Sequence, residues 1–233
     1  MSPVTLPAHH GGIRGGVELP TSKSLTNRAL IASAVAGGGT IVTPLDCDDT
    51  RVLAAALRDA GWSVTWETEI EVGGRTIPDH RVRLDLADSG TGSRLILALL
   101  AASPGRSFVD GSDRLRERPM IPLLEALIRL GATVRSRDGF LPVEIDGAVL
   151  DGGSVEVQPE ISSQFVSALV MAGPLMRQGL ELAVSGPLPS APYLDLTVDA
   201  MRAFGSELEV SDDRRSWQVL PVALQKTRYE VEG

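Results

Sequence analysis

Residues 19–30 read Leu-Pro-Thr-Ser-Lys-Ser-Leu-Thr-Asn-Arg-Ala-Leu, and this stretch decides the expected fold. A short extended run leads into a turn rich in serine and threonine, and an apolar series follows at 29–36. The pattern is typical of a strand, a capped turn and the start of a helix. Lys23, Ser24 and Arg28 therefore lie in or just after the turn, where free backbone N–H groups and the helix dipole favour an anion. An ordinary capped helix with exposed basic residues is the alternative interpretation.

Two kinds of helix recur along the chain. Almost wholly apolar helices, each preceded by a polar cap, are predicted at 24–36, 91–102 and 162–176. Three further helices are predicted to end on Gly61, Gly131 and Gly205, because glycine is the residue expected after a helix C-cap. A strand-like run follows each helix of both kinds. The chain therefore reads as three copies of a unit of roughly 70 residues, each with two helices and several strands.

The distribution of apolar residues predicts which elements are inside. A helix that is apolar all round is expected to be buried on every side. A strand whose residues alternate between apolar and polar, such as 81–86, is expected to have one face exposed to solvent. We therefore predict an inside-out α/β domain of three repeats over 18–233, with helices buried and sheets outside. A doubly wound sheet, with continuous apolar strands and amphipathic helices, is the alternative fold.

The two ends of the chain carry separate expectations. Residues 1–17 are weakly patterned and are predicted to be an N-terminal segment that leads in from, or pairs with, a further domain. The last strand-like run, 227–233, is expected to lack a partner within this chain. An unpaired terminal strand would mean that more of the molecule should follow.

Composition excludes several classes of function. The formal net charge of −8 argues against a general nucleic-acid binder, which would carry a basic face. Cys47 is the only cysteine and the three histidines lack metal-ligand spacing, so we expect no metal and no cofactor. A signal peptide is not apparent, and apolar runs such as 95–102 are too short to cross a bilayer. The sequence predicts a soluble, cytoplasmic protein without membrane or nucleic-acid partners.

The turns that open the three apolar helices each carry polar or cationic groups. If the units pack about a pseudo-threefold axis, these turns converge and form an anion site without a metal. The residues concerned are Lys23, Ser24 and Arg28 in the first turn, Gly90, Thr91 and Arg94 in the second, and Ser162, Ser163 and Gln164 in the third. The other helices add Arg118, Ser190 and Tyr193.

Each of these groups also has a plain structural interpretation. Arg114, Arg116 and Arg118 could form a solvated charge cluster with Glu117. The serines at 162–163 could be no more than a helix cap, and the glycines at 90 and 92 could serve only the turn. Recurrence of polar groups at the same place in each unit favours the functional interpretation.

Five motifs together resemble one family, the 3-phosphoshikimate 1-carboxyvinyltransferases or EPSP synthases. They are Leu-Pro-x-Ser-Lys-Ser-x-x-Asn-Arg-Ala at 19–29, Gly-Thr-x-x-Arg at 90–94, Arg-x-Arg-Glu-Arg-Pro at 114–119, Ser-Ser-Gln-Phe at 162–165 and Ser-x-Pro-Tyr-x-Asp at 190–195. The resemblance covers 18 to about 233, which corresponds to the N-terminal half of such an enzyme. It implies a fold of two similar domains, each built from three repeats with helices inside.

The resemblance also implies an activity. These transferases of the shikimate pathway, which supplies aromatic amino acids, move the enolpyruvyl group of phosphoenolpyruvate to the 5-hydroxyl of shikimate 3-phosphate and release phosphate. By resemblance, shikimate 3-phosphate would be bound by Lys23, Ser24, Arg28, Ser162, Ser163, Gln164, Ser190 and Tyr193. Phosphoenolpyruvate would be bound by Lys23, Gly90, Thr91, Arg94, Arg118 and Gln164, with Lys23 also catalytic. The family is the target of the inhibitor glyphosate.

The sequence departs from the family pattern around the phosphoenolpyruvate pocket. Thr21 replaces a usual glycine, Asp88-Ser89 a usual Asn-Ala and Leu95 a common proline. The Asp88 carboxylate would repel an anion unless Arg94 or another cation neutralises it. The family's second domain has no counterpart in the sequence, so we expect the chain alone to bind shikimate 3-phosphate weakly and to be inactive.

Two other functions stay open. A UDP-N-acetylglucosamine enolpyruvyl transferase shares the fold, but it typically has Lys-Asn in the first motif and a loop cysteine that 110–118 lack. A non-catalytic anion-binding domain on the same scaffold is the second alternative.

Overall fold

The computed structural model describes residues 15–17, 19–158 and 162–233. Its helices are α1 (Lys23–Val35), α2 (Asp48–Asp59), α3 (Gly90–Ala101), α4 (Asp113–Arg116), α5 (Ile121–Arg129), α6 (Gln164–Ala172), the 3₁₀ turn η1 (Gly173–Leu175) and α7 (Pro192–Ala203). Its strands are β1 (Gly39–Val42), β2 (Trp62–Trp66), β3 (Ile70–Arg75), β4 (Val82–Asp85), β5 (Gly105–Asp110), β6 (Thr133–Arg137), β7 (Phe140–Gly147), β8 (Gly153–Val157), β9 (Leu180–Val184), β10 (Leu208–Val210), β11 (Ser216–Val219) and β12 (Thr227–Glu230). The predicted N-terminal segment falls largely outside the described residues.

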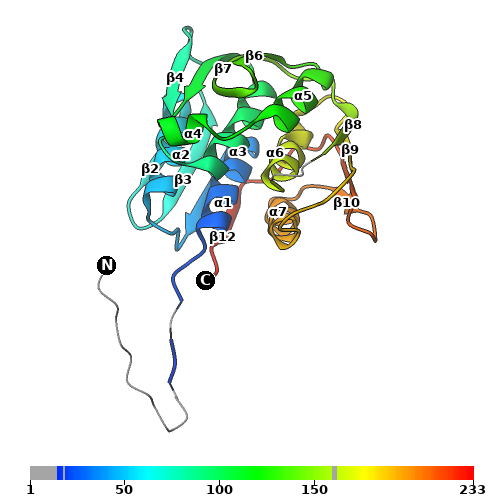
Figure 1. Ribbon diagram of the computed structural model, residues 1–233. Coiled ribbons are helices and arrows are strands. Elements are labelled where there is room, and N and C mark those ends of the chain that lie inside the picture. The colour runs from blue at the N-terminus through cyan, green and yellow to red at the C-terminus, as the bar shows by residue number, and fades with distance from the viewer. Residues whose placement is uncertain (1–14, 18, 159–161) are drawn as a thin grey trace, which may run out of the picture.

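The strands of the described chain form three four-stranded sheets with one shared topology. Their orders are β12-β1-β3-β2, β4-β5-β7-β6 and β8-β9-β11-β10. The first two strands of each sheet are parallel and the remaining neighbours are antiparallel. This repetition confirms the three predicted units, and Figure 1 shows the strands arranged around the helices.

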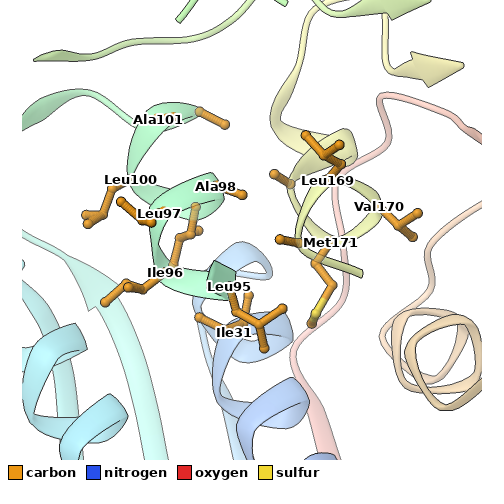
Figure 2. Packing of buried hydrophobic residues seen from close by; sticks show 14 of the residues in the cluster. Ile31, Leu95, Ile96, Leu97, Ala98, Leu100, Ala101, Leu169, Val170 and Met171 are labelled. Carbon is orange, nitrogen blue, oxygen red and sulfur yellow. The ribbon is translucent and has the colours of Figure 1, made fainter. Parts of the chain in front are cut away.

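Helices α1, α3 and α6 occupy the centre of the domain. Every residue of α1 from 25 to 34 is buried, and α3 and α6 are buried over most of their length. Figure 2 shows Ile31 of α1, Leu95 of α3 and Met171 of α6 pointing into the space between the three helices. Because these helices lack a polar face, only enclosure on all sides removes their apolar surface from water. The inside-out prediction is confirmed, and the doubly wound alternative is wrong.

Helices α2, α5 and α7 pack against the central helices, each against two of them, and the central helices also contact the sheets directly. Each has a buried stripe and an exposed face, and each stops at a glycine in the left-handed region. The backbone φ is +100° at Gly61, +101° at Gly131 and +79° at Gly205. A side chain would strain the chain there, so these glycines end the helices as the sequence predicted.

The prediction of an unpaired final strand was wrong. Strand β12 pairs in parallel with β1, with Gly39 opposite Thr227 and Val42 opposite Glu230. The first unit thus takes its outer parallel strand from the far end of the chain, whereas β4 and β8 precede their own units. Linear inspection of the sequence misses such a pairing because the partners are far apart.

Three local details also differ from expectation. Strand β3 was not predicted, because Gly73 and Gly74 lower strand propensity. A Cβ on Gly73 would lie 3.1 Å from Ser63 Cβ, so the glycine serves close contact with β2. Helix α4 was not predicted, and α5 begins at Ile121 after the Arg118-Pro119 pair rather than on it. Within the described residues, no helix has the length and apolar character needed to cross a membrane.

Candidate functional site

A cavity of about 320 Å³ lies where the N-terminal ends of α1, α3 and α6 meet the turn before α7. It is lined by Lys23, Ser24, Arg28, Thr91, Ser162, Ser163, Gln164, Pro189, Ser190 and Tyr193. The predicted convergence of the three turns is therefore observed. A larger hollow of about 540 Å³ lies beside α5 and β8, but its lining mixes prolines and apolar side chains with Glu125, Arg129 and Glu156. It gathers no comparable set of cations and hydroxyls.

Arg28 is the most deeply placed cation of the cavity, with 1% of its surface exposed. Its Nε donates to Thr197 Oγ1 at 2.8 Å, and its Nη1 donates to the Ser24 carbonyl at 3.0 Å. Its Nη2 donates to Ser167 Oγ at 3.3 Å and to the Tyr193 carbonyl at 2.9 Å. Burial lowers the pKa of Arg28 to about 10, so the side chain stays charged at neutral pH. Among the described residues it contacts no carboxylate, which leaves its charge for an incoming anion.

Lys23 lies at the mouth of the cavity and is half exposed. Its ammonium group forms an ion pair with Asp49, near the N-terminus of α2. The hydrogen bond from Lys23 to Asp49 raises the pKa of Lys23, more than partial burial lowers it. The lysine is thus held as a cation beside the cavity, with Asp49 as its ion-pair partner.

A polar clamp joins the second and third turns. Gln164 Nε2 donates to Thr91 Oγ1 at 2.9 Å, and Gln164 Oε1 accepts from Arg94. Arg94 Nη1 also lies 3.4 Å from Ser162 Oγ, and the guanidinium stands over the Phe165 ring at 4.9 Å. The clamp fixes the N-terminal ends of α3 and α6 relative to one another.

Gly90, Arg94 and Arg118 lie beside this cavity rather than in its lining. A Cβ on Gly90 would overlap Arg118 Nη1, so the guanidinium rests directly on the start of α3. Burial, and then the charge of Arg118, lower the pKa of Arg94 to about 10. The two guanidinium groups therefore add a second cationic patch next to the first.

The neighbouring arginines behave differently from Arg118. Arg116 pairs with Asp110 at 2.8 Å and with Asp113 at 3.0 Å, and these partners raise its pKa. Arg116 therefore belongs to an exposed ion-pair cluster, but its partners are Asp110 and Asp113 rather than the expected Glu117. Arg118 instead lies against Gly90.

Neither Arg94 nor another cation of the described residues pairs with Asp88, so the condition for relieving its repulsion of an anion is not met by an ion pair. Its carboxylate accepts a hydrogen bond from Ser112 Oγ at 2.6 Å, and no ion pair to it occurs among the described residues. Arg94 is occupied by Gln164 and Ser162 instead. This hydrogen bond holds Asp88 against Ser112, the residue that precedes α4.

The last turn of the site is held in an unusual backbone conformation. Ser190 has a φ of +56°, in the left-handed region that few side chains adopt. Its carbonyl accepts from the Tyr193 amide at 3.0 Å, which starts α7. Tyr193 remains 47% exposed and lines the cavity. Such strain is typical of segments whose shape serves a ligand.

Three residues that support the site were missed in the sequence. Asp49 was not predicted as a site residue, although it pairs with Lys23 at the mouth of the cavity. Ser167 and Thr197 lie on buried faces of α6 and α7 and contact Arg28 from far along the chain. Their sequence signal is a hydroxyl within an otherwise apolar stripe. Within the described residues, no cluster of His, Cys, Asp and Glu could hold a metal ion.

The fold is that of enolpyruvyl transferase domains. The enolpyruvyl transferase NikO from Streptomyces tendae superposes with a TM-score of 0.64 over 95% of this chain and 53% of its own, and at 21% identity this likeness concerns the fold alone. The family model described as EPSP synthase (3-phosphoshikimate 1-carboxyvinyltransferase) matches residues 8–233. The chain belongs to the EPSP synthase family.

Individual relatives agree with this assignment. A 3-phosphoshikimate 1-carboxyvinyltransferase of Halobacterium salinarum is 43% identical over 201 residues, which cover 83% of this chain and 46% of the relative. One from Shewanella amazonensis is 38% identical over 216 residues, which cover 89% of this chain and 50% of the relative. The EPSP synthase of Acinetobacter baumannii superposes with a TM-score of 0.80 at 27% identity, and the match covers 93% of this chain and 49% of that structure's chain. The chain thus spans about half the length of the curated relatives it matches.

Proposed function

We propose that this chain is the shikimate 3-phosphate-binding half of an EPSP synthase. In the complete enzyme it would act with a second domain to transfer the enolpyruvyl group of phosphoenolpyruvate to the 5-hydroxyl of shikimate 3-phosphate, with release of phosphate. The observation that carries the proposal is the cavity at the converging helix ends, where Arg28 offers a buried charge without a carboxylate partner among the described residues.

The lining of the cavity suits a small hydroxylated ring compound that carries a phosphate and a carboxylate. The hydroxyls of Ser24, Ser162, Ser163 and Ser190 can donate to phosphate oxygens, and backbone N–H groups at the helix starts add further donors. Arg28 and Lys23 supply positive charges opposite the negative phosphate and carboxylate of the ligand. Gln164 and Tyr193 complete this substrate's proposed contacts.

Phosphoenolpyruvate is proposed to bind next to it, against the second cationic patch. Gly90, Thr91, Arg94 and Arg118 surround the start of α3, and Gln164 bridges to the first pocket. Lys23, which lines the cavity, is proposed to contact both substrates and to act on the reacting atoms. Two phosphates and two carboxylates close together require such a concentration of fixed donors, which also stabilise charge in the transition state.

Calorimetry on the purified chain tests the proposal. Shikimate 3-phosphate is expected to bind weakly and UDP-N-acetylglucosamine not at all. Binding of the nucleotide sugar alone would favour the other transferase, and binding of neither would favour a different anion-binding role. A steady-state assay is expected to show no phosphate release by the chain alone, and robust release would contradict the need for a second domain.

A further inference from the structure

Behind the cavity, two buried hydroxyls hold Arg28 in place. Ser167 Oγ of α6 and Thr197 Oγ1 of α7 lie 2.8 Å apart, and each side chain is 1% exposed. Both accept hydrogen bonds from the Arg28 guanidinium, at 3.3 and 2.8 Å. Thr197 Oγ1 also lies 3.0 Å from the Tyr193 carbonyl, to which its proton is donated. Helices of the third unit therefore position a cation that belongs to the first unit.

The hydrogen atoms of this cluster can be assigned by counting donors and acceptors. A hydroxyl has one donor and two acceptor positions. Thr197 donates to the Tyr193 carbonyl, so the proton between the two hydroxyls comes from Ser167. Ser167 Oγ and Thr197 Oγ1 are then both free to accept from Arg28. Every hydroxyl proton in the cluster has an acceptor.

The same count shows how many N–H groups of Arg28 remain for a ligand. A guanidinium has five N–H groups, and four of them are directed to protein oxygens within the described residues: one on Nε, two on Nη2 and one on Nη1. The remaining N–H, on Nη1, belongs to a side chain that lines the cavity. All four protein acceptors are hydroxyl or carbonyl oxygens, which orient the cation without cancelling its charge. Lys23, by contrast, is paired with a carboxylate.

We propose that Thr197 and Ser167 are positioning residues that hold Arg28 as an unneutralised cation and leave a single Nη1 N–H for the anionic group of the substrate. This inference rests on the proposed binding of shikimate 3-phosphate. It predicts that affinity depends on hydroxyls that do not line the cavity. A valine at 197 keeps the shape of threonine but removes the acceptor for Nε, so the guanidinium is expected to turn toward another oxygen.

Calorimetric titration of the chain with shikimate 3-phosphate tests the inference. Thr197→Val is expected to weaken binding about tenfold or more, and Thr197→Ser, which keeps the hydroxyl, to restore it to within about twofold. Ser33→Ala is the matched control, because Ser33 is fully buried in α1 and its Oγ has no hydrogen-bond partner in the described structure. Its affinity should equal that of the parent chain.

The outcomes separate the two proposals. If the parent chain does not bind shikimate 3-phosphate, the proposed function fails and this inference fails with it. If the parent chain binds and folded Thr197→Val binds equally well, only the positioning role is overturned. Should Thr197→Val not fold, Ser167→Ala takes its place, with an expected loss of several-fold and with unchanged affinity as the contrary result. The Nε–H resonance of Arg28 gives a second readout, since its protection from solvent exchange should persist in Thr197→Ser and be lost in Thr197→Val.

Discussion

The guanidinium of Arg118 lies against the backbone of Gly90, in the space that a side chain at residue 90 would occupy. The glycine is therefore required for contact as well as for the turn. It lets a cation from the segment between α4 and α5 reach the positive end of α3. The alternative interpretation, in which this glycine serves only the turn, does not account for the contact.

The first prediction concerns this contact. Gly90→Ala should displace Arg118 and, in an enzyme completed by the proposed second domain, raise the KM for phosphoenolpyruvate about tenfold, since an ionic hydrogen bond is lost. The KM for shikimate 3-phosphate should change little. Gly74→Ala is the control, because an added Cβ there meets nothing within 4 Å. An unchanged KM for phosphoenolpyruvate in Gly90→Ala would separate Arg118 from that substrate.

Lys23→Ala tests the cation at the cavity mouth. The ion pair with Asp49 is largely exposed, and such pairs contribute about 0–1 kcal/mol, so the melting temperature should hardly move. Binding of shikimate 3-phosphate should nevertheless weaken about tenfold. Lys226→Ala, which removes the other lysine of the chain, should leave calorimetric binding unchanged. A large fall in melting temperature would show that Lys23 is chiefly structural.

Ser163→Ala addresses the third turn. Ser163 is 3% exposed, lines the cavity and precedes α6, and no side-chain capping bond from it is present. Its hydroxyl is therefore free to serve a ligand, and we expect several-fold weaker binding of shikimate 3-phosphate without loss of helix content. Circular dichroism and calorimetry together check this result. A destabilised variant with normal affinity would support the simple helix-cap interpretation.

The pH dependence of binding should come from the ligand rather than from the protein. Interaction with Asp49 raises the pKa of Lys23, and the pKa of Arg28 is about 10, so both stay charged up to about pH 9. A phosphate monoester loses its second proton near pH 6, so affinity should rise from pH 5 to 7 and then stay level. Shikimate without phosphate should show no such rise. A midpoint near pH 8 would contradict this account.

The same pKa values give the direction of a stability effect. The pKa of Arg28 in the folded chain is below its ordinary value, so the unfolded chain binds its proton more tightly. Burial of Arg28 thus costs stability at neutral pH, and the cost is relieved only as pH rises through about 10.

Leu95 tests the packing of the central helices. Leu95→Ala should lower the free energy of unfolding by about 2–5 kcal/mol, because the side chain is 1% exposed and lies between α1, α3 and α6. Ile128→Ala, at a site 52% exposed, should change it by less than about 0.5 kcal/mol. Urea unfolding followed by circular dichroism compares the two. Equal changes in the free energy of unfolding for the two variants would mean that packing between the central helices is not the main source of stability.

Local rules predicted much of this domain from the sequence. Gly61 and its two counterparts end their helices because left-handed backbone favours glycine, and uniform apolarity of the central helices required burial. Contacts between distant segments were not predictable in this way. Arg28 meets Thr197, and Gly39 meets Thr227, through tertiary packing that leaves no periodic signal in either segment. The cavity residues of the three turns were predictable because a polar turn recurs in each unit and because the motifs resemble a family, whereas Pro189 of the lining was not predicted.

The parallel pairing of β1 with β12 has a consequence for synthesis on the ribosome. A nascent chain exposes one edge of β1, with unpaired N–H and C=O groups, until residues 227–230 have emerged. The first unit is thus made earliest but completed last, and the domain cannot mature unit by unit as a simple tandem array would. A ribosome that stalls before Thr227 would release a product whose first sheet is open to pairing with other chains.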